Sequence, residues 1–159
     1  LVDGLRERDV QLLAIACPEE PTLSVLEEAL PAARLLRPDW VVALGGGAAL
    51  DMGKALAALI PARGAPRDHL ELAGPGLPLT AAPLPFVAIP TTAGTGAEVT
   101  KNAVIGLPDL GRKVSLRDDR MLARLAIVDP SLTDHCPRAV TLGSGLDAVT
   151  QVIEAFVSH

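Results

Sequence analysis

The chain has 159 residues, a formal net charge of −5 at pH 7 and 49% hydrophobic residues. This length predicts one domain, or one domain and part of another, and the hydrophobic content excludes a disordered chain. The acidic balance without a basic stretch argues against a nucleic-acid surface. Two cysteines, Cys17 and Cys136, are too few for a disulfide framework, so we expect a cytoplasmic protein.

Neither a membrane span nor a signal peptide is expected. Glycine, proline or charge interrupts the longest apolar runs well short of the ~20 residues that a membrane span needs. No basic segment followed by an apolar core opens the chain. The chain begins at Leu1 in what resembles the end of a helix and stops at His159 in or after another, which suggests a piece of a longer protein.

The first half of the chain alternates predicted strands and helices. Residues 10–16 form a short apolar run typical of a strand, and the capping-box pattern at 24–27 predicts a helix start. Pro31 is expected to kink or end that helix, or to begin it. Residues 40–44 are almost entirely apolar, which is typical of a strand buried on both faces of a parallel sheet. A helix rich in alanine and leucine is predicted over 48–60.

The second half continues this alternation after a long loop. Residues 61–85 contain many prolines and glycines and are expected to form a surface loop. A buried strand is predicted at 86–89, with the polar loop 91–96 after it. Short strands are predicted at 102–106, 112–116 and 125–128. Strands alternating with helices indicate an α/β domain with a parallel sheet.

The last segment, 137–158, favours a helix with a break near Gly143 and Gly145. Apolar residues repeat in it at helical spacing and predict a stripe that packs in a core. The members of this stripe are Leu146, Val149, Ile153, Phe156 and Val157. Because Asp129-Pro130 and Cys136-Pro137 punctuate the chain before this segment, we expect one domain over 1–133 and the beginning of another over 134–159.

Three consecutive glycines, Gly45, Gly46 and Gly47, stand between a predicted strand and a predicted helix. Glycine lets a phosphate approach the backbone closely, and the free N–H groups at a helix start favour an anion. A tight turn explains the same glycines as well, and they do not form the G-x-G-x-x-G fingerprint. Asp51, in the first helical turn, either compensates the helix dipole or accepts a hydrogen bond from a cofactor.

The loop after the strand at 86–89 is rich in hydroxyl groups, with Thr91, Thr92 and Thr95 among its glycines. In open α/β sheets, ligands bind beyond the carboxyl ends of the strands, so this loop favours a binding function over simple turn chemistry. Asp147 and Gln151 share a helix face at i and i+4, which is more often surface decoration, although a carboxylate there could hold a metal.

Together, these segments resemble the iron-containing, or group III, alcohol dehydrogenase family. Residues 45–51 are similar to its GGGSxxD motif, and residues 90–100 match PTTAGTGSEVT except that Ala97 replaces serine. Residues 145–156 resemble the helix written GxDALTHAIEAY. Two further landmarks are present, at 112–113 and 127–133.

The resemblance implies an oxidoreductase with two domains. A Rossmann-like α/β domain binds NAD or NADP, and a helical domain holds a divalent metal, Fe²⁺ or Zn²⁺. Hydride passes between the nicotinamide and a small alcohol, aldehyde or ketone, while the metal acts as a Lewis acid. The resemblance also implies a homodimer or larger homo-oligomer, while the acidic charge and the short apolar runs predict no nucleic-acid or membrane partner. The family's first strand, whose acidic residue separates NAD from NADP, has no counterpart here.

The resemblance assigns no catalytic residue but places many residues beside the cofactor. Gly46 and Gly47 would face the pyrophosphate, with Ala48 donating its backbone N–H. Lys113 would reach the nicotinamide ribose, and Leu132 would lie against it. The full set of cofactor-binding residues is Gly45, Gly46, Gly47, Ala48, Asp51, Thr91, Thr92, Thr95, Asn102, Lys113 and Leu132.

The metal-binding assignment departs from the family pattern. Asp147 would be the first ligand, but Gln151 stands where the family has a histidine. A glutamine amide oxygen is a weaker, neutral ligand. The histidines, His69, His135 and His159, match no metal position and are expected at the surface.

Gln151 therefore leaves two alternatives open. One is a related reductase with an altered or absent metal site, similar to maleylacetate reductase or glycerol dehydrogenase. The other is a dinucleotide-binding remnant that has lost catalysis.

Overall fold

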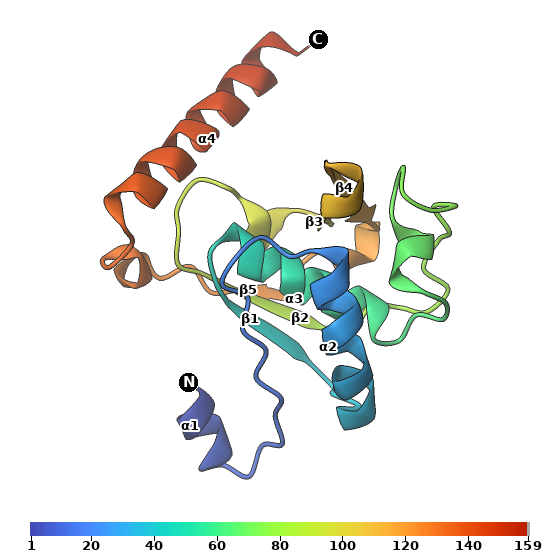
Figure 1. Ribbon diagram of the computed structural model, residues 1–159. Helices are drawn as coiled ribbons and strands as arrows, with labels where there is room; N and C mark the ends of the chain where they lie inside the picture. The colour runs from blue at the N-terminus through green and yellow to red at the C-terminus, as the bar shows by residue number, and fades with distance from the viewer. Residues whose placement is uncertain (159) are drawn as a thin grey trace.

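The computed structural model describes residues 1–158 and has an α/β fold (Figure 1). Its α-helices are Val2–Arg6 (α1), Leu23–Leu36 (α2), Gly47–Leu59 (α3) and Arg138–Val157 (α4). Its strands are Val41–Gly45 (β1), Phe86–Pro90 (β2), Asn102–Leu107 (β3), Arg112–Arg117 (β4) and Leu125–Ala126 (β5). Short 3₁₀ helices lie at Pro66–His69 (η1), Ala97–Val99 (η2), Pro108–Leu110 (η3), Asp119–Met121 (η4) and Pro130–Thr133 (η5).

The strands form two separate sheets. Strands β1, β2 and β5 are parallel and adjacent in that order, with Gly45 opposite Pro90 at the carboxyl edge. Strands β3 and β4 form an antiparallel hairpin. The parallel sheet, with α3 as the crossover helix between β1 and β2, confirms the predicted α/β class. Strand β5 has two residues and is clearly shorter than the strand predicted at 125–128.

Helix α3 is the centre of the core, and residues 52–59 are all buried. It packs on β1 and β2 on one side and on α2 and the β3–β4 hairpin on the other (Figure 1). Gly53 permits the close approach to the sheet, since a Cβ there would lie 2.7 Å from the Ala43 Cβ and 2.8 Å from the Phe86 ring. An apolar helix of this kind is stable because both of its sides are covered.

The N-cap of helix α2 lies two residues before the predicted cap, and the helix continues through its proline. Thr22 is the N-cap, and its hydroxyl accepts a hydrogen bond from Val25 N at 3.4 Å. Pro31 lies inside the helix on its exposed side, where water can satisfy the carbonyl that lacks a partner. The expected end or start of the helix at Pro31 was therefore wrong, because the buried side of the helix keeps its packing, and the expected kink stays a prediction.

The strand predicted at 10–16 is absent, and these residues have no regular secondary structure and no pairing partner. Val10, Leu13 and Ile15 are about two-fifths exposed, at 44%, 42% and 36%. A strand needs hydrogen bonds to a neighbouring strand, and none of the strands formed by residues 1–158 lies beside this segment. The apolar pattern alone could not supply that neighbour.

Strand β1 is covered on one face only, which corrects the prediction of burial on both faces. Ala43 is buried under α3, whereas Val42 and Leu44 are 46% and 47% exposed. Within residues 1–158, no helix packs on that second face of the sheet (Figure 1). The sequence pattern of a fully buried strand is present, but its second covering layer is not among the described residues.

Helix α4 is continuous through Gly143 and Gly145, so the predicted break was wrong. None of its residues is buried, and it extends away from the sheet (Figure 1). The apolar stripe predicted to enter a core is exposed, from 54% at Ile153 to 87% at Phe156. Helical spacing determines which residues share a face, but burial of that face needs a partner element.

By length and composition alone, α4 is the one helix among residues 1–158 that is long and apolar enough to cross a membrane. Asp147 and Glu154 lie within it, and acidic residues are rare inside membrane spans. Length and composition are therefore only a weak indication of a span.

Candidate functional site

The turn between β1 and α3 leaves the start of a buried helix open to a ligand. Gly45 has a φ of 155°, and a Cβ there would lie 2.6 Å from the Ala49 Cβ. Gly46 is the N-cap of α3, and no side chain of the described residues caps it. The first backbone N–H groups of α3 therefore keep the hydrogen-bonding capacity that favours an anion.

The threonine loop, residues 91–96, lies directly against this glycine turn. Thr91 N donates to Gly45 O at 2.9 Å, which joins the carboxyl ends of β1 and β2. Thr92 packs on Gly46, where a Cβ would lie 3.2 Å from the Thr92 Cγ2. The structure thus brings together the predicted glycines and hydroxyls at the edge of the sheet where ligands bind in this class of fold.

Thr95 and Gly47 make the matching contact one residue further into α3. A Cβ at Gly47 would lie 3.3 Å from both Cγ2 and Oγ1 of Thr95. A side chain at either glycine would press on a threonine, so glycine at these positions favours the mutual packing of the two loops. Ala48 lies beside them, and its carbonyl oxygen accepts a hydrogen bond from the Cys17 thiol at 3.7 Å.

Asp51 bonds to protein groups through both carboxylate oxygens. Its Oδ1 is 3.0 Å from Lys54 Nζ, and its Oδ2 accepts a hydrogen bond from Val104 N at 3.0 Å. Burial is the larger cause that raises the pKa of the Cys17 thiol, and the negative charge of Asp51 raises it further. The predicted contact between Asp51 and a cofactor stays a prediction.

Sequence reasoning missed Lys54, which is only 1% exposed. Its ammonium donates to Ala97 O at 2.9 Å and to Thr100 Oγ1 at 2.8 Å, in addition to pairing with Asp51. A lysine three residues after Asp51, inside an otherwise apolar helix, is the signal that could have identified it.

The remaining predicted cofactor residues lie on the hairpin and on η5. Asn102 begins β3, and Lys113 lies on β4, where its ammonium pairs with Glu20 at 2.5 Å. Leu132 lies in η5 and is 38% exposed. No hydrogen bond or ion pair among the described residues joins them to the glycine turn, so their roles stay predictions.

Helix α4 brings Asp147 and Gln151 to the threonine loop. Gln151 Nε2 donates to Asp147 Oδ2 at 2.9 Å and lies 3.3 Å from Thr95 O. Gly94 permits this approach, since its φ is 137° and a Cβ there would lie 1.8 Å from Ser144 O. The two predicted metal residues are therefore adjacent and next to the candidate cofactor loop.

These residues do not by themselves fit a metal site. Asp147 supplies one carboxylate, and the amide N–H of Gln151, rather than its oxygen, is assigned toward that carboxylate. No cluster of three or more histidine, cysteine, aspartate or glutamate side chains suited to a metal occurs in residues 1–158. A stable site for iron or zinc needs more ligands than this pair provides.

The histidines do not add ligands. The surface position expected for His69 was wrong, because it is 6% exposed and its ring nitrogens each lie 2.9 Å from a carbonyl oxygen, of Leu77 and of Arg63. His135 is exposed, as expected. His159 lies outside the described residues.

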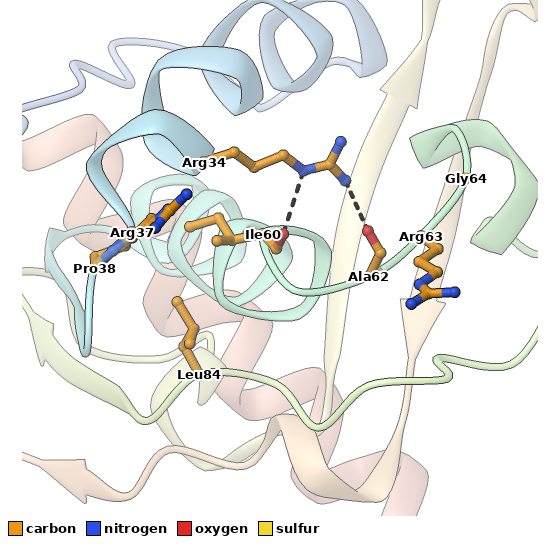
Figure 2. A pocket seen from close by; sticks show the side chains of 8 residues that line it. All are labelled: Arg34, Arg37, Pro38, Ile60, Ala62, Arg63, Gly64 and Leu84. Atoms are coloured by element: carbon orange, nitrogen blue, oxygen red, sulfur yellow. Dashed lines mark hydrogen bonds between the residues drawn. The ribbon is translucent and has the colours of Figure 1, made fainter.

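A pocket lies at the carboxyl end of α3, where Arg34 of α2 is among its lining residues. Figure 2 shows Arg34 reaching across from α2, with hydrogen bonds to Ile60 O and Ala62 O at 3.2 and 3.0 Å. Arg34 also donates to Leu59 O at 2.8 Å. The guanidinium thereby satisfies carbonyl groups at the carboxyl end of α3, so this cavity is not part of the glycine and threonine site.

The fold and the site define an α/β domain with an uncapped helix start at the carboxyl edge of its parallel sheet, and comparisons with known proteins identify its family. The model of the iron-containing alcohol dehydrogenases matches residues 1–130. Long-chain-alcohol dehydrogenase 1 of Geobacillus thermodenitrificans is 43% identical over 139 residues, which are 87% of this chain and 34% of that protein. The chain therefore belongs to the iron-containing alcohol dehydrogenase family, as its motifs indicated.

Solved structures agree with this assignment. NADH-dependent butanol dehydrogenase A of Thermotoga maritima matches with a TM-score of 0.86 and 26% identity, over 96% of this chain and 38% of that chain. Sulfoacetaldehyde reductase of Bifidobacterium kashiwanohense, solved in complex with NAD⁺, matches with a TM-score of 0.83 and 31% identity, over 98% of this chain and 43% of that chain. The chain spans about a third of the length of the curated relatives that it matches.

Proposed function

We propose that the protein transfers hydride between NAD or NADP and a small alcohol, aldehyde or ketone. The single observation that carries this proposal is the contact between the threonine loop and the glycine turn at the open start of α3. Such an edge accepts the pyrophosphate of a dinucleotide. The NADH dependence of the butanol dehydrogenase and the NAD⁺ bound to the sulfoacetaldehyde reductase support a nicotinamide cofactor.

In this proposal the backbone of Gly46 and Gly47 faces the pyrophosphate, and Ala48 donates its N–H. The hydroxyls of Thr91, Thr92 and Thr95 contact the dinucleotide from the facing loop. The nicotinamide end lies toward the remaining residues, which are Asn102, Lys113 and Leu132. The cofactor supplies the hydride chemistry, while these residues bind and orient it.

The metal forms a separate part of the proposal. The family description supports iron as the metal, with zinc as the alternative, and Asp147 as the carboxylate that would hold it. Because Gln151 donates to that carboxylate, a reductase with an altered or absent metal site is the second candidate. Metal analysis of the full-length protein, with aldehyde reduction measured before and after chelation, separates the two. Chelation-sensitive activity restored by iron or zinc supports the metal enzyme, and metal-independent turnover supports the second candidate.

We also propose the organisation of the whole protein. Residues 1–133 form the cofactor-binding domain, and residues 134–159 begin a helical one, because α4 has no buried residue. The low cysteine content supports a cytoplasmic protein, and the family likeness supports a homodimer or larger homo-oligomer. Size-exclusion chromatography with light scattering on the full-length protein measures the oligomeric state.

Cofactor binding is tested with Gly46→Val in the full-length protein. The valine would collide with Thr92 and cover the N–H groups at the start of α3, so NADH and NADPH should bind at least about tenfold more weakly. Fluorescence titration with each nucleotide measures the affinity, and circular dichroism confirms folding. The matched control, Leu35→Val, changes a residue that is 86% exposed on α2. Unchanged affinity in Gly46→Val would overturn the proposed site.

A further inference from the structure

Lys54 is a buried charge whose presence in the core requires an explanation. It lies in the middle of α3 with 1% of its surface exposed, and the other buried residues of this helix are apolar or glycine. Burying an ammonium group is costly unless every N–H finds a partner. An apolar side chain would fill the same space without that cost, so the partners of Lys54 indicate what the charge contributes.

The ammonium makes two hydrogen bonds and one ion pair, and the two hydrogen bonds join α3 to the segment that follows the threonine loop. Nζ lies 3.0 Å from Asp51 Oδ1, 2.9 Å from Ala97 O and 2.8 Å from Thr100 Oγ1. The second carboxylate oxygen of Asp51 accepts from Val104 N, at 3.0 Å, on β3. A single network therefore connects α3, η2 and β3.

The network holds one end of the threonine loop, and the sheet holds the other. Thr91 N is bonded to Gly45 O at the upstream end, while Ala97 and Thr100 are bonded to Lys54 at the downstream end. Gly96, with a φ of 66°, turns the chain between the loop and η2. With both ends fixed to the frame of α3, Thr92 and Thr95 are kept against Gly46 and Gly47.

We propose that Lys54, together with Asp51, is a positioning residue that sets the threonine loop over the glycine turn for dinucleotide binding. This inference rests on the proposed function, because it assigns the loop its role in holding the cofactor. Asp51 then acts through Lys54 and Val104 rather than by touching the cofactor. Loss of the network should loosen the loop while the sheet and its packing on α3 persist.

Thr100 offers the sharpest test, since it contacts Lys54 but is not among the residues placed at the cofactor. Thr100→Val in the full-length protein removes one partner of the ammonium and leaves the ion pair with Asp51 intact. We expect NADH to bind about tenfold more weakly. Thr100→Ser keeps the hydroxyl and should bind NADH as the natural protein does. In turnover, the KM for the cofactor should rise in Thr100→Val, with kcat at saturating cofactor close to that of the natural protein.

Lys54→Met provides the larger perturbation, and Lys101→Met is its matched control. Lys101 directly follows Thr100 in the sequence, but its side chain is exposed and pairs with Asp119 on the surface. We expect Lys54→Met to weaken NADH binding more than Thr100→Val does and Lys101→Met to leave it unchanged. If Lys54→Met fails to fold, the Thr100 series decides the matter alone.

Two results would overturn the inference. One is a lower melting temperature in Thr100→Val with unchanged NADH affinity, which would make the network a purely structural feature. The other is a loss of affinity in Thr100→Ser as large as that in Thr100→Val. Failure of the proposed function is distinct from both, because the natural protein would then bind neither NADH nor NADPH.

Discussion

Helices α3 and α4 are both rich in apolar residues, yet they have opposite surroundings. Residues 52–59 of α3 are buried between the parallel sheet and the hairpin, and even Lys54 within them has all its partners. Helix α4 has no buried residue, although its apolar side chains repeat at helical spacing. An apolar helix face predicts that a partner is needed, but only the partner itself turns that face into a core.

The same contrast appears in the candidate site. The glycine turn and the threonine loop are in contact and complete within residues 1–158. Gln151 on α4 reaches that loop and donates to Asp147, but the two residues leave the predicted metal site without enough ligands among residues 1–158. Contacts within residues 1–158 therefore support the proposed cofactor site, whereas only the residue types support the proposed metal site.

The two phenylalanines of the chain test this contrast with the largest expected effect. Phe86 is 2% exposed against α3, and Phe156 is 87% exposed on α4. In urea unfolding of the 159-residue chain, Phe86→Ala should lower the free energy of unfolding by about 3–5 kcal/mol. Phe156→Ala should change it by less than about 0.5 kcal/mol. A comparable loss in both variants would show that α4 packs on the α/β unit.

A pair of helical glycines should respond in opposite directions. A Cβ at Gly53 in α3 would lie 2.7 Å from the Ala43 Cβ, so Gly53→Ala should destabilise the chain by about 1–3 kcal/mol. Gly143 in α4 has no atom within 4 Å of such a Cβ. Gly143→Ala should therefore stabilise the chain by about 0.5–1 kcal/mol through helix propensity. Melting temperatures measure both, and a destabilising Gly143→Ala would mean that this side of α4 is covered.

The smallest effect concerns one ion pair within the α/β unit. The side-chain hydrogen bond from Arg120 holds the pKa of Asp118 below its ordinary value, against an opposing effect of burial. Asp118→Asn should lower the free energy of unfolding by about 1 kcal/mol at pH 7.

The pH dependence of that effect has a defined sign. Because the pKa is lower in the folded state, the stabilisation is complete above the unfolded value, about 4, and is lost as pH falls through the folded one. Denaturation of both proteins between pH 7 and 3 should show their difference shrinking below about pH 4. Asp39→Asn, at an exposed turn without an ion pair in residues 1–158, is the control. A constant difference across this range would contradict the assignment to the Asp118 carboxylate.

The motifs predicted the site better than the packing around it. The sequence places the glycines at 45–47 and the threonines of 91–96 each directly after a strand, and the structure shows these two segments in contact, while their role in binding stays a prediction. Lys54 was missed, since its partners at Ala97 and Thr100 lie more than forty residues away in the chain. The burial of His69 was missed as well, because a segment rich in proline and glycine predicts an exposed loop and does not indicate which of its side chains pack inward.

The sequence by itself determined the α/β class, the positions of most strands and helices, and the family to which the chain belongs. These follow from periodicity, turn residues and motifs, all of which act over a few neighbouring residues. Only the tertiary structure decided that 10–16 does not pair, that one face of β1 stays open and that α4 runs unbroken with its apolar stripe exposed. It also decided that Asp51 bonds to Lys54 and β3. The physical reason is that strand pairing, burial and charge satisfaction depend on which distant groups lie alongside.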